Sequence, residues 1–161
     1  PHLERDRFNH LLNVVGEHRF WNAQPIMKPT EKIAREGMIN IHAKDIPTEP
    51  LALPEGFYWE TFDATDDAEA LEICDFLQDH YVESSTGDFK LIYTVERFRW
   101  AVLPPGYIKD LHTLVRSTKT KKIMATNLTI PKKMVVHGQN QKMAENNFLA
   151  VHQNLRDKRM A

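Results

Sequence analysis

The clearest candidate chemistry in this 161-residue chain is a short basic cluster near its last residue. Arg156, Lys158 and Arg159 follow an apolar, strand-like stretch at 148–151, and a polar turn separates the two. A strand that leads into a turn with available N–H groups and cations can bind a phosphate at the start of a helix. The pattern predicts an anion site, with its helix beginning at or just after Ala161, and hence a fragment of a longer protein.

The same cluster has a plainer interpretation, because runs of charged residues are usually solvated. The turn contains no glycine, so neither a P-loop nor a dinucleotide-binding loop fits it. The eight histidines show no paired spacing, and we expect His112 and His152 to be satisfied, half-buried strand residues. No catalytic triad, carboxylate pair or zinc spacing is present, and we expect no metal. An enzyme of this sequence would depend on positioning and backbone polarisation.

Composition narrows the class of protein. The length suits one domain with a core, and the net charge of -1 gives no general attraction to nucleic acid or membrane. The single cysteine, Cys74, excludes an internal disulfide and falls in an apolar helical pattern, which predicts a core thiol. No apolar run is long enough to span a bilayer. We therefore expect a soluble protein of a reducing compartment, without a nucleic-acid partner or an inserted segment.

The sequence divides into three regions, and the elements that must position the basic cluster lie in the last of them. Residues 1–17 carry a helical stripe, and 18–56 form a proline-rich arm with apolar residues that favour packing on a surface. Residues 57–161 form the main domain. It starts with a strand at 57–62, followed by a helix from the capping-box residue Asp66 to Tyr81 and a second helix from Thr94 to the prolines at 104–105.

The rest of the main domain has strand patterns. Strands at 111–115 and 123–130 flank a basic turn at 117–121. A short strand at 134–136 turns at His137-Gly138 into a longer one at about 142–152. This order predicts an α+β fold with a mostly antiparallel, mixed sheet flanked by helices, truncated after the strand that leads to the phosphate loop.

Several segments resemble one family in the correct order. Residues 19–25, RFWNAQP, resemble the "FWxTQPV" segment of the glycylpeptide N-tetradecanoyltransferases, the N-myristoyltransferases. Residues 53–59, LPEGFYW, are similar to "LPxGFxW", and 142–152, KMAENNFLAVH, to "KMVEINFLCVH". Residues 155–161, LRDKRMA, match "LRSKRVAP" up to the alanine. The resemblance covers about residues 18–161.

The resemblance implies an acyl-CoA N-acyltransferase-like fold and a reaction. Tetradecanoyl-CoA would be the acyl donor, and proteins or peptides with an N-terminal glycine would be the acceptors. The family has two related halves, and this chain resembles most of the first, which binds acyl-CoA. The glycine amine attacks the thioester after the family's own C-terminal carboxylate deprotonates it. Residues 1–161 alone are expected to be inactive, and the alternative is a non-catalytic remnant that binds acyl-CoA or peptide.

The resemblance also implies roles for individual residues. The backbone N–H groups of Phe148 and Leu149 would form an oxyanion hole. The implied coenzyme-binding residues are Arg19, Phe20, Trp21, Phe148, Leu149, Ala150, Val151, Arg156, Asp157, Lys158, Arg159, Met160 and Ala161. The implied peptide-binding residues are Tyr81, Val82, Phe89 and Leu91.

Three departures from the family pattern stand out. The loop at 84–87 reads SSTG where the family usually has an acidic run, which argues against a strong preference for basic peptides. The family strand "VGFIS" is MATNL at 124–128, more polar than a buried strand should be. Asp157 replaces a serine and places a carboxylate where phosphate is expected.

Overall fold

The computed structural model describes residue 32 and residues 47–82 and 86–158. From Leu51 onward the chain forms one compact unit. The predicted helix within residues 1–17 and most of the predicted arm lie outside the described residues.

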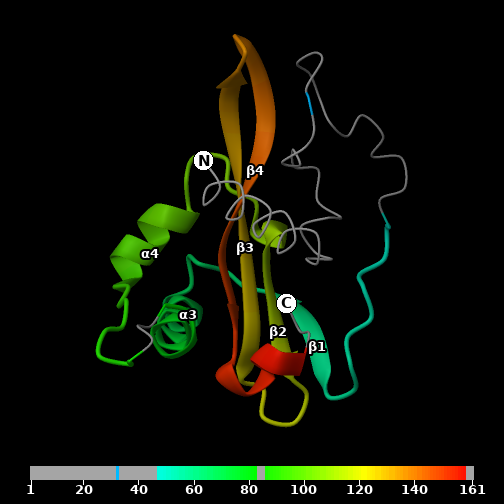
Figure 1. Cartoon of the computed structure of the whole chain (residues 1–161), viewed down its shortest axis with the longest axis vertical. Coiled ribbons are helices and arrows are strands. Elements are labelled where there is room, and N and C mark those ends of the chain that lie inside the picture. The colour runs from blue at the N-terminus through cyan, green and yellow to red at the C-terminus, as the bar shows by residue number, and fades with distance from the viewer. Residues whose placement is uncertain (1–31, 33–46, 83–85, 159–161) are drawn as a thin grey trace, which may run out of the picture. The chain divides into compact units, whose positions relative to one another are not determined.

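The unit is built on a four-stranded antiparallel meander (Figure 1). Its strands are β1 (Phe57–Thr61), β2 (His112–Ser117), β3 (Ile123–Val136) and β4 (Gln139–Val151), in that order across the sheet. The α+β prediction is confirmed. All three pairings of the described strands are antiparallel, because each strand pairs with its neighbour in sequence and none needs a parallel crossover.

Two helices lie between β1 and β2, as predicted. α3 (Asp67–His80) begins where the Asp66 carboxylate accepts the Glu69 N–H at 2.9 Å. α4 (Val95–Val102) begins where Thr94 Oγ1 accepts the Arg97 N–H at 3.3 Å. Side-chain caps of this kind satisfy N–H groups that have no partner within the helix. One 3₁₀ turn, η1 (Lys109–Leu111), precedes β2, and another, η2 (Gln153–Lys158), follows β4.

The predicted division of β3 into strands at 123–130 and 134–136 is wrong. β3 continues through Pro131, which pairs with Ala144 of β4. Proline interrupts a strand mainly where its missing N–H is needed by a neighbour. The pairing of β2 with β3 ends at Leu128, so only β4 adjoins β3 at Pro131. β4 likewise begins at Gln139, earlier than the predicted 142.

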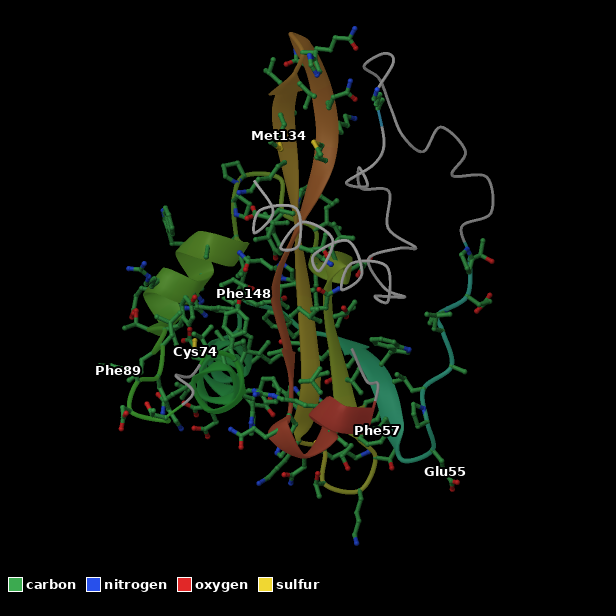
Figure 2. All side chains as sticks on the ribbon, viewed as in Figure 1. Glu55, Phe57, Cys74, Phe89, Met134 and Phe148 are labelled. Carbon is green, nitrogen blue, oxygen red and sulfur yellow. The ribbon has the colours of Figure 1, made fainter. Side chains whose placement is uncertain are left out.

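The outer part of the β3–β4 hairpin extends past β1 and β2 (Figure 1). Its apolar side chains are exposed, and Figure 2 labels one of them, Met134. The others are Val135, Val136 and Met143. This part of the hairpin therefore contributes little to the core.

The main core lies between the sheet and the two helices. It contains Phe62, Leu77, Phe98, Leu128 and Phe148 among its buried members. Cys74 belongs to it and is buried, which confirms the predicted core thiol, and burial raises the pKa of that thiol. A smaller cluster of Val115, Ala125, Val151 and Leu155 is separate from it. No helix among the described residues is long and apolar enough to cross a membrane.

The prediction of a satisfied, half-buried ring is wrong for His112. Its ring is completely buried between Phe62 and Tyr107, at centroid distances of 5.2 and 5.8 Å. Neither ring nitrogen has a hydrogen-bond partner. Burial lowers the pKa of His112, although nearby Asp63 opposes the shift. His152 fits the prediction better, since it is partly buried and its Nδ1 accepts the Asn154 N–H at 3.3 Å.

Candidate functional site

The candidate site centres on a β-bulge near the end of β4. Leu128 pairs with Asn147 and Thr126 with Ala150, so Phe148 and Leu149 both lie opposite the single residue Asn127. A bulge redirects the two backbone groups that it removes from the ladder, and bulges are frequent beside active sites. Phe148 and Leu149 are the residues predicted from the resemblance to bind a thioester oxygen.

Phe148 has an unusual backbone for a bulky residue, with φ of 50°. This left-handed conformation places Cβ close to the following carbonyl and is disfavoured for non-glycine residues. Two hydrogen bonds accompany it. The Phe148 N–H donates to Asn147 Oδ1 at 2.9 Å, and the Phe148 carbonyl accepts from Thr126 Oγ1 at 2.7 Å.

Aromatic side chains enclose the Phe148 ring, which is 3% exposed. Tyr81, Tyr93 and Phe98 lie around it at centroid distances of 5.8, 5.3 and 5.6 Å. Figure 2 shows Phe148 on β4, on the side of the sheet that carries α3 and α4. Burial raises the pKa of Tyr93, with a smaller contribution from Tyr81. The bulge is therefore held from the core side by packed rings, whereas the Leu149 side chain is exposed.

The structure brings together some of the predicted peptide-binding residues. Tyr81 ends α3 and contacts Phe148, and the Leu91 N–H donates to the Val82 carbonyl at 3.3 Å. Val82 and Leu91 are both exposed apolar residues, and Val82 directly follows Tyr81 in the chain. Phe89 is 77% exposed and lies on the outer side of the loop, away from Phe148 in Figure 2.

Two further predicted coenzyme residues, Ala150 and Val151, occupy the last two positions of β4. Ala150 and Val151 are buried, with Ala150 in the main core and Val151 in the smaller cluster. β4 is the last strand of the described sheet, so the edge away from β3 has no strand partner there. A sheet edge of this kind can pair with an extended chain that carries amide groups.

The predicted phosphate segment is only partly described. Arg156 Nε donates to the Val151 carbonyl at 3.2 Å, and Nη2 donates to the His80 carbonyl at 2.5 Å. Arg156 thus joins the last turn of α3 to the end of β4. Asp157 and Lys158 belong to η2, and Arg159, Met160 and Ala161 lie outside the described residues, as do Arg19, Phe20 and Trp21.

Sequence reasoning missed three residues that shape this site, namely Thr126, Asn147 and Tyr93. The sequence did carry a sign of Thr126, because it is a polar residue on the same face of its strand as the buried Leu128 and Ile130. No local pattern indicated that the Asn147 side chain would accept a hydrogen bond from the N–H of Phe148. In the described part of the chain, no group of three or more His, Cys, Asp or Glu residues could hold a metal ion.

Comparisons with known proteins identify the family to which the chain belongs. Residues 38–161 match the family model for the N-terminal domain of myristoyl-CoA:protein N-myristoyltransferase. The chain is 37% identical over 161 residues to a glycylpeptide N-tetradecanoyltransferase of Schizosaccharomyces pombe, covering 98% of this chain and 34% of that protein. Against the Dictyostelium discoideum protein of the same name it is 39% identical over 145 residues, covering 89% and 35%.

Solved structures give the same result. A Saccharomyces cerevisiae N-myristoyltransferase with bound myristoyl-CoA superposes with a TM-score of 0.80 at 36% identity, covering 89% of this chain and 35% of that one. A second such structure gives a TM-score of 0.83 at 33% identity, covering 94% and 38%. The chain spans about a third of the length of these relatives. Because the family model matches most of its length, the chain belongs to the N-myristoyltransferase family, within that family's N-terminal domain.

Proposed function

We propose that the protein transfers a tetradecanoyl group from tetradecanoyl-CoA to the N-terminal glycine amine of other proteins. The observation that carries the proposal is the bulge at Phe148 and Leu149, in a chain of this family. Relatives of the same family have been solved with bound myristoyl-CoA.

The chemistry needs a polarised carbonyl more than a side-chain nucleophile. The amine nitrogen attacks the thioester carbon, the C–N bond forms, and negative charge develops on the carbonyl oxygen. The backbone N–H groups of Phe148 and Leu149 would donate to that oxygen. The C–S bond then breaks and coenzyme A leaves as its thiolate, which takes up the proton that the attacking amine loses. Fixed N–H donors aimed at a developing oxyanion are often the largest single catalytic contribution, worth about 10²–10³ in rate per donor.

The open edge of β4 supports the coenzyme part of the proposal. Pantetheine is an extended chain with two amide groups, and it can pair with the backbone at Ala150 and Val151 as an added strand would. The 3′,5′-ADP end would lie by the segment from Arg156 to Ala161, where cations and a turn can hold phosphate. Arg19, Phe20 and Trp21 would cover the coenzyme.

The acceptor peptide would enter beside Tyr81, whose ring packs against the Phe148 ring with their centroids 5.8 Å apart. The exposed apolar side chains of Val82 and Leu91 fit a peptide surface, and Phe89 would extend it outward. The SSTG loop at 84–87 argues against a strong requirement for basic peptides. We propose that the protein acts as a monomer in the cytoplasm, as the resemblance implies.

One observation favours the alternative of a non-catalytic binding protein. The Phe148 N–H already donates to Asn147 Oδ1, so the carboxamide must move away or share the donor for a thioester oxygen to be bound. If it does neither, the fold could bind acyl-CoA without turnover.

The test compares two peptides that differ at one residue. The full-length protein is incubated with tetradecanoyl-CoA and either a glycine-led peptide or the same peptide led by alanine, and products are weighed by mass spectrometry. We expect transfer to the glycine peptide alone, and none from residues 1–161 by themselves, since they cover only about a third of the relatives. Coenzyme binding without transfer would favour the binding protein, and neither binding nor transfer would refute both.

A further inference from the structure

The Thr126 hydroxyl lies directly behind the bulge. Thr126 is 2% exposed, and its Oγ1 donates to the Phe148 carbonyl at 2.7 Å. The bulge takes that carbonyl out of the regular ladder, because Thr126 itself pairs with Ala150. A buried carbonyl without a donor is costly, and a threonine hydroxyl on a stiff β-branched side chain supplies one in a fixed direction.

This hydrogen bond fixes the orientation of the whole peptide unit between Phe148 and Leu149. The Phe148 carbonyl and the Leu149 N–H belong to the same planar peptide unit, and no cis peptide bond occurs among the described residues. In a trans unit the C=O and N–H point in opposite directions. Fixing the Phe148 carbonyl toward Thr126 therefore fixes the Leu149 N–H in the direction away from Thr126.

The rest of the bulge does not fix that peptide plane. The aromatic rings hold the Phe148 side chain, and Asn147 Oδ1 holds the N–H on the preceding peptide unit. Opposite rotations about the Phe148 ψ and Leu149 φ angles would turn the peptide unit between them while leaving both of those contacts, and the pairing of Ala150 with Thr126, in place. The quoted family segment "VGFIS" has phenylalanine where this chain has Thr126, so the hydroxyl contact is a feature of this chain.

We propose that the Thr126 hydroxyl is a positioning group for acyl transfer, which directs the Leu149 N–H at the thioester oxygen. The inference rests on the proposed function and deepens it. Thr126 does not touch the reacting atoms. Its effect passes through one peptide unit, so it acts on the rate of the chemical step rather than on coenzyme affinity.

The test uses substitutions that separate the hydroxyl from the shape of the side chain. Thr126→Val keeps the shape and removes the donor, and Thr126→Ser keeps the donor. Thr129→Val is the matched control, because Thr129 Oγ1 makes a cross-strand bond to Asn146 Oδ1 at 2.6 Å three residues further along β3. Thr126→Ala replaces the valine variant if that variant does not fold.

In steady-state transfer assays on the full-length protein, Thr126→Val should lower kcat about 5- to 30-fold with KM for tetradecanoyl-CoA within about twofold. This range lies between the loss of one ordinary hydrogen bond, about fivefold, and the loss of a whole oxyanion donor. Thr126→Ser and Thr129→Val should stay within about threefold of the parent protein.

A binding measurement supplies a readout that does not need turnover. Two inert analogues are compared by calorimetry: a ketone with a methylene between sulfur and carbonyl, and the corresponding alkyl thioether without the oxygen. The ketone should bind more tightly to the parent protein, and Thr126→Val should reduce that ratio by about threefold or more. A structural role alone would weaken both analogues equally.

The outcomes are distinct. If the parent protein transfers the acyl group and Thr126→Val has the same kcat, the positioning role is wrong and the proposed function stands. Equal weakening of both analogues would also overturn the positioning role. If the folded parent protein binds coenzyme without transfer, the proposed function fails, and this inference fails with it.

Discussion

The left-handed backbone of Phe148 makes a measurable prediction about stability. At most positions, replacing alanine by glycine lowers the free energy of unfolding, because glycine gains freedom in the unfolded chain and loses a methyl group in the folded one. At φ of 50° the balance differs, since glycine has no Cβ to clash. We therefore expect the step from alanine to glycine to be nearly neutral at position 148.

The magnitude follows from the conformation and the packing. Phe148→Ala should cost about 3–5 kcal/mol, because the ring is 3% exposed and packs against three other aromatic rings. Phe148→Gly loses the same ring. Compared with alanine, glycine lowers the free energy of unfolding by about 1–2 kcal/mol, because the unfolded chain gains freedom and the folded protein loses a methyl group. Glycine also avoids the strain of the left-handed backbone, which costs alanine about 1–2 kcal/mol, so the two effects nearly cancel.

Ala150 provides the matched comparison on the same strand. It is buried and pairs regularly with Thr126, so Ala150→Gly should cost about 1–2 kcal/mol with no compensating relief. Urea denaturation of the two Phe148 variants, the Ala150 variant and the parent protein gives all four free energies of unfolding. An alanine-to-glycine step that costs as much at 148 as at 150 would refute the claim that Phe148 is strained.

Other predictions concern stability and pH. Burial lowers the pKa of His112 in the folded protein below the usual histidine value of 6.5. As the pH falls below 6.5, the His112 side chain therefore takes up a proton in the unfolded chain before it does so in the folded protein. The free energy of unfolding should therefore decrease below that pH, and His112→Phe should flatten this decrease in urea titrations. Arg116 contacts both Glu72 oxygens at 2.6 and 2.8 Å, so Arg116→Lys should cost about 1 kcal/mol, whereas the same change at the exposed Arg97 should have no measurable effect. Asn127→Leu should raise the free energy of unfolding by about 1–2 kcal/mol, because it removes a buried amide oxygen without a hydrogen-bond partner, and a decrease would contradict this reasoning.

Local signals predicted the elements between the arm and β2 well. The helices α3 and α4 begin at the caps that Asp66 and Thr94 indicated, because capping depends on residues within one turn of each other. The continuity of β3 through Pro131 was missed, since it depends on where β2 stops pairing, which is a property of the sheet.

The site was predicted less completely than the fold. The resemblance indicated Phe148 and Leu149 as site residues. No short-range pattern indicates the bulge there, because its geometry depends on the pairing of β3 with β4 and on four aromatic rings. The burial of His112 was missed for a similar reason. Its neighbours Phe62 and Tyr107 come from separate parts of the chain and meet only in the folded protein.

The meander of the sheet has a consequence for the order of folding. β3 and β4 are joined by the turn at His137-Gly138, so their pairing needs only local contacts, and hairpins form within about 1–10 μs. The pairing of β1 with β2 must close a loop that contains both helices, which is slower. We expect the bulge to form early, together with the hairpin, and to become rigid only when the aromatic rings of α3, α4 and the segment between them pack against Phe148. Slow amide exchange at the bulge should therefore appear later in refolding than exchange protection in the adjoining rungs of the hairpin.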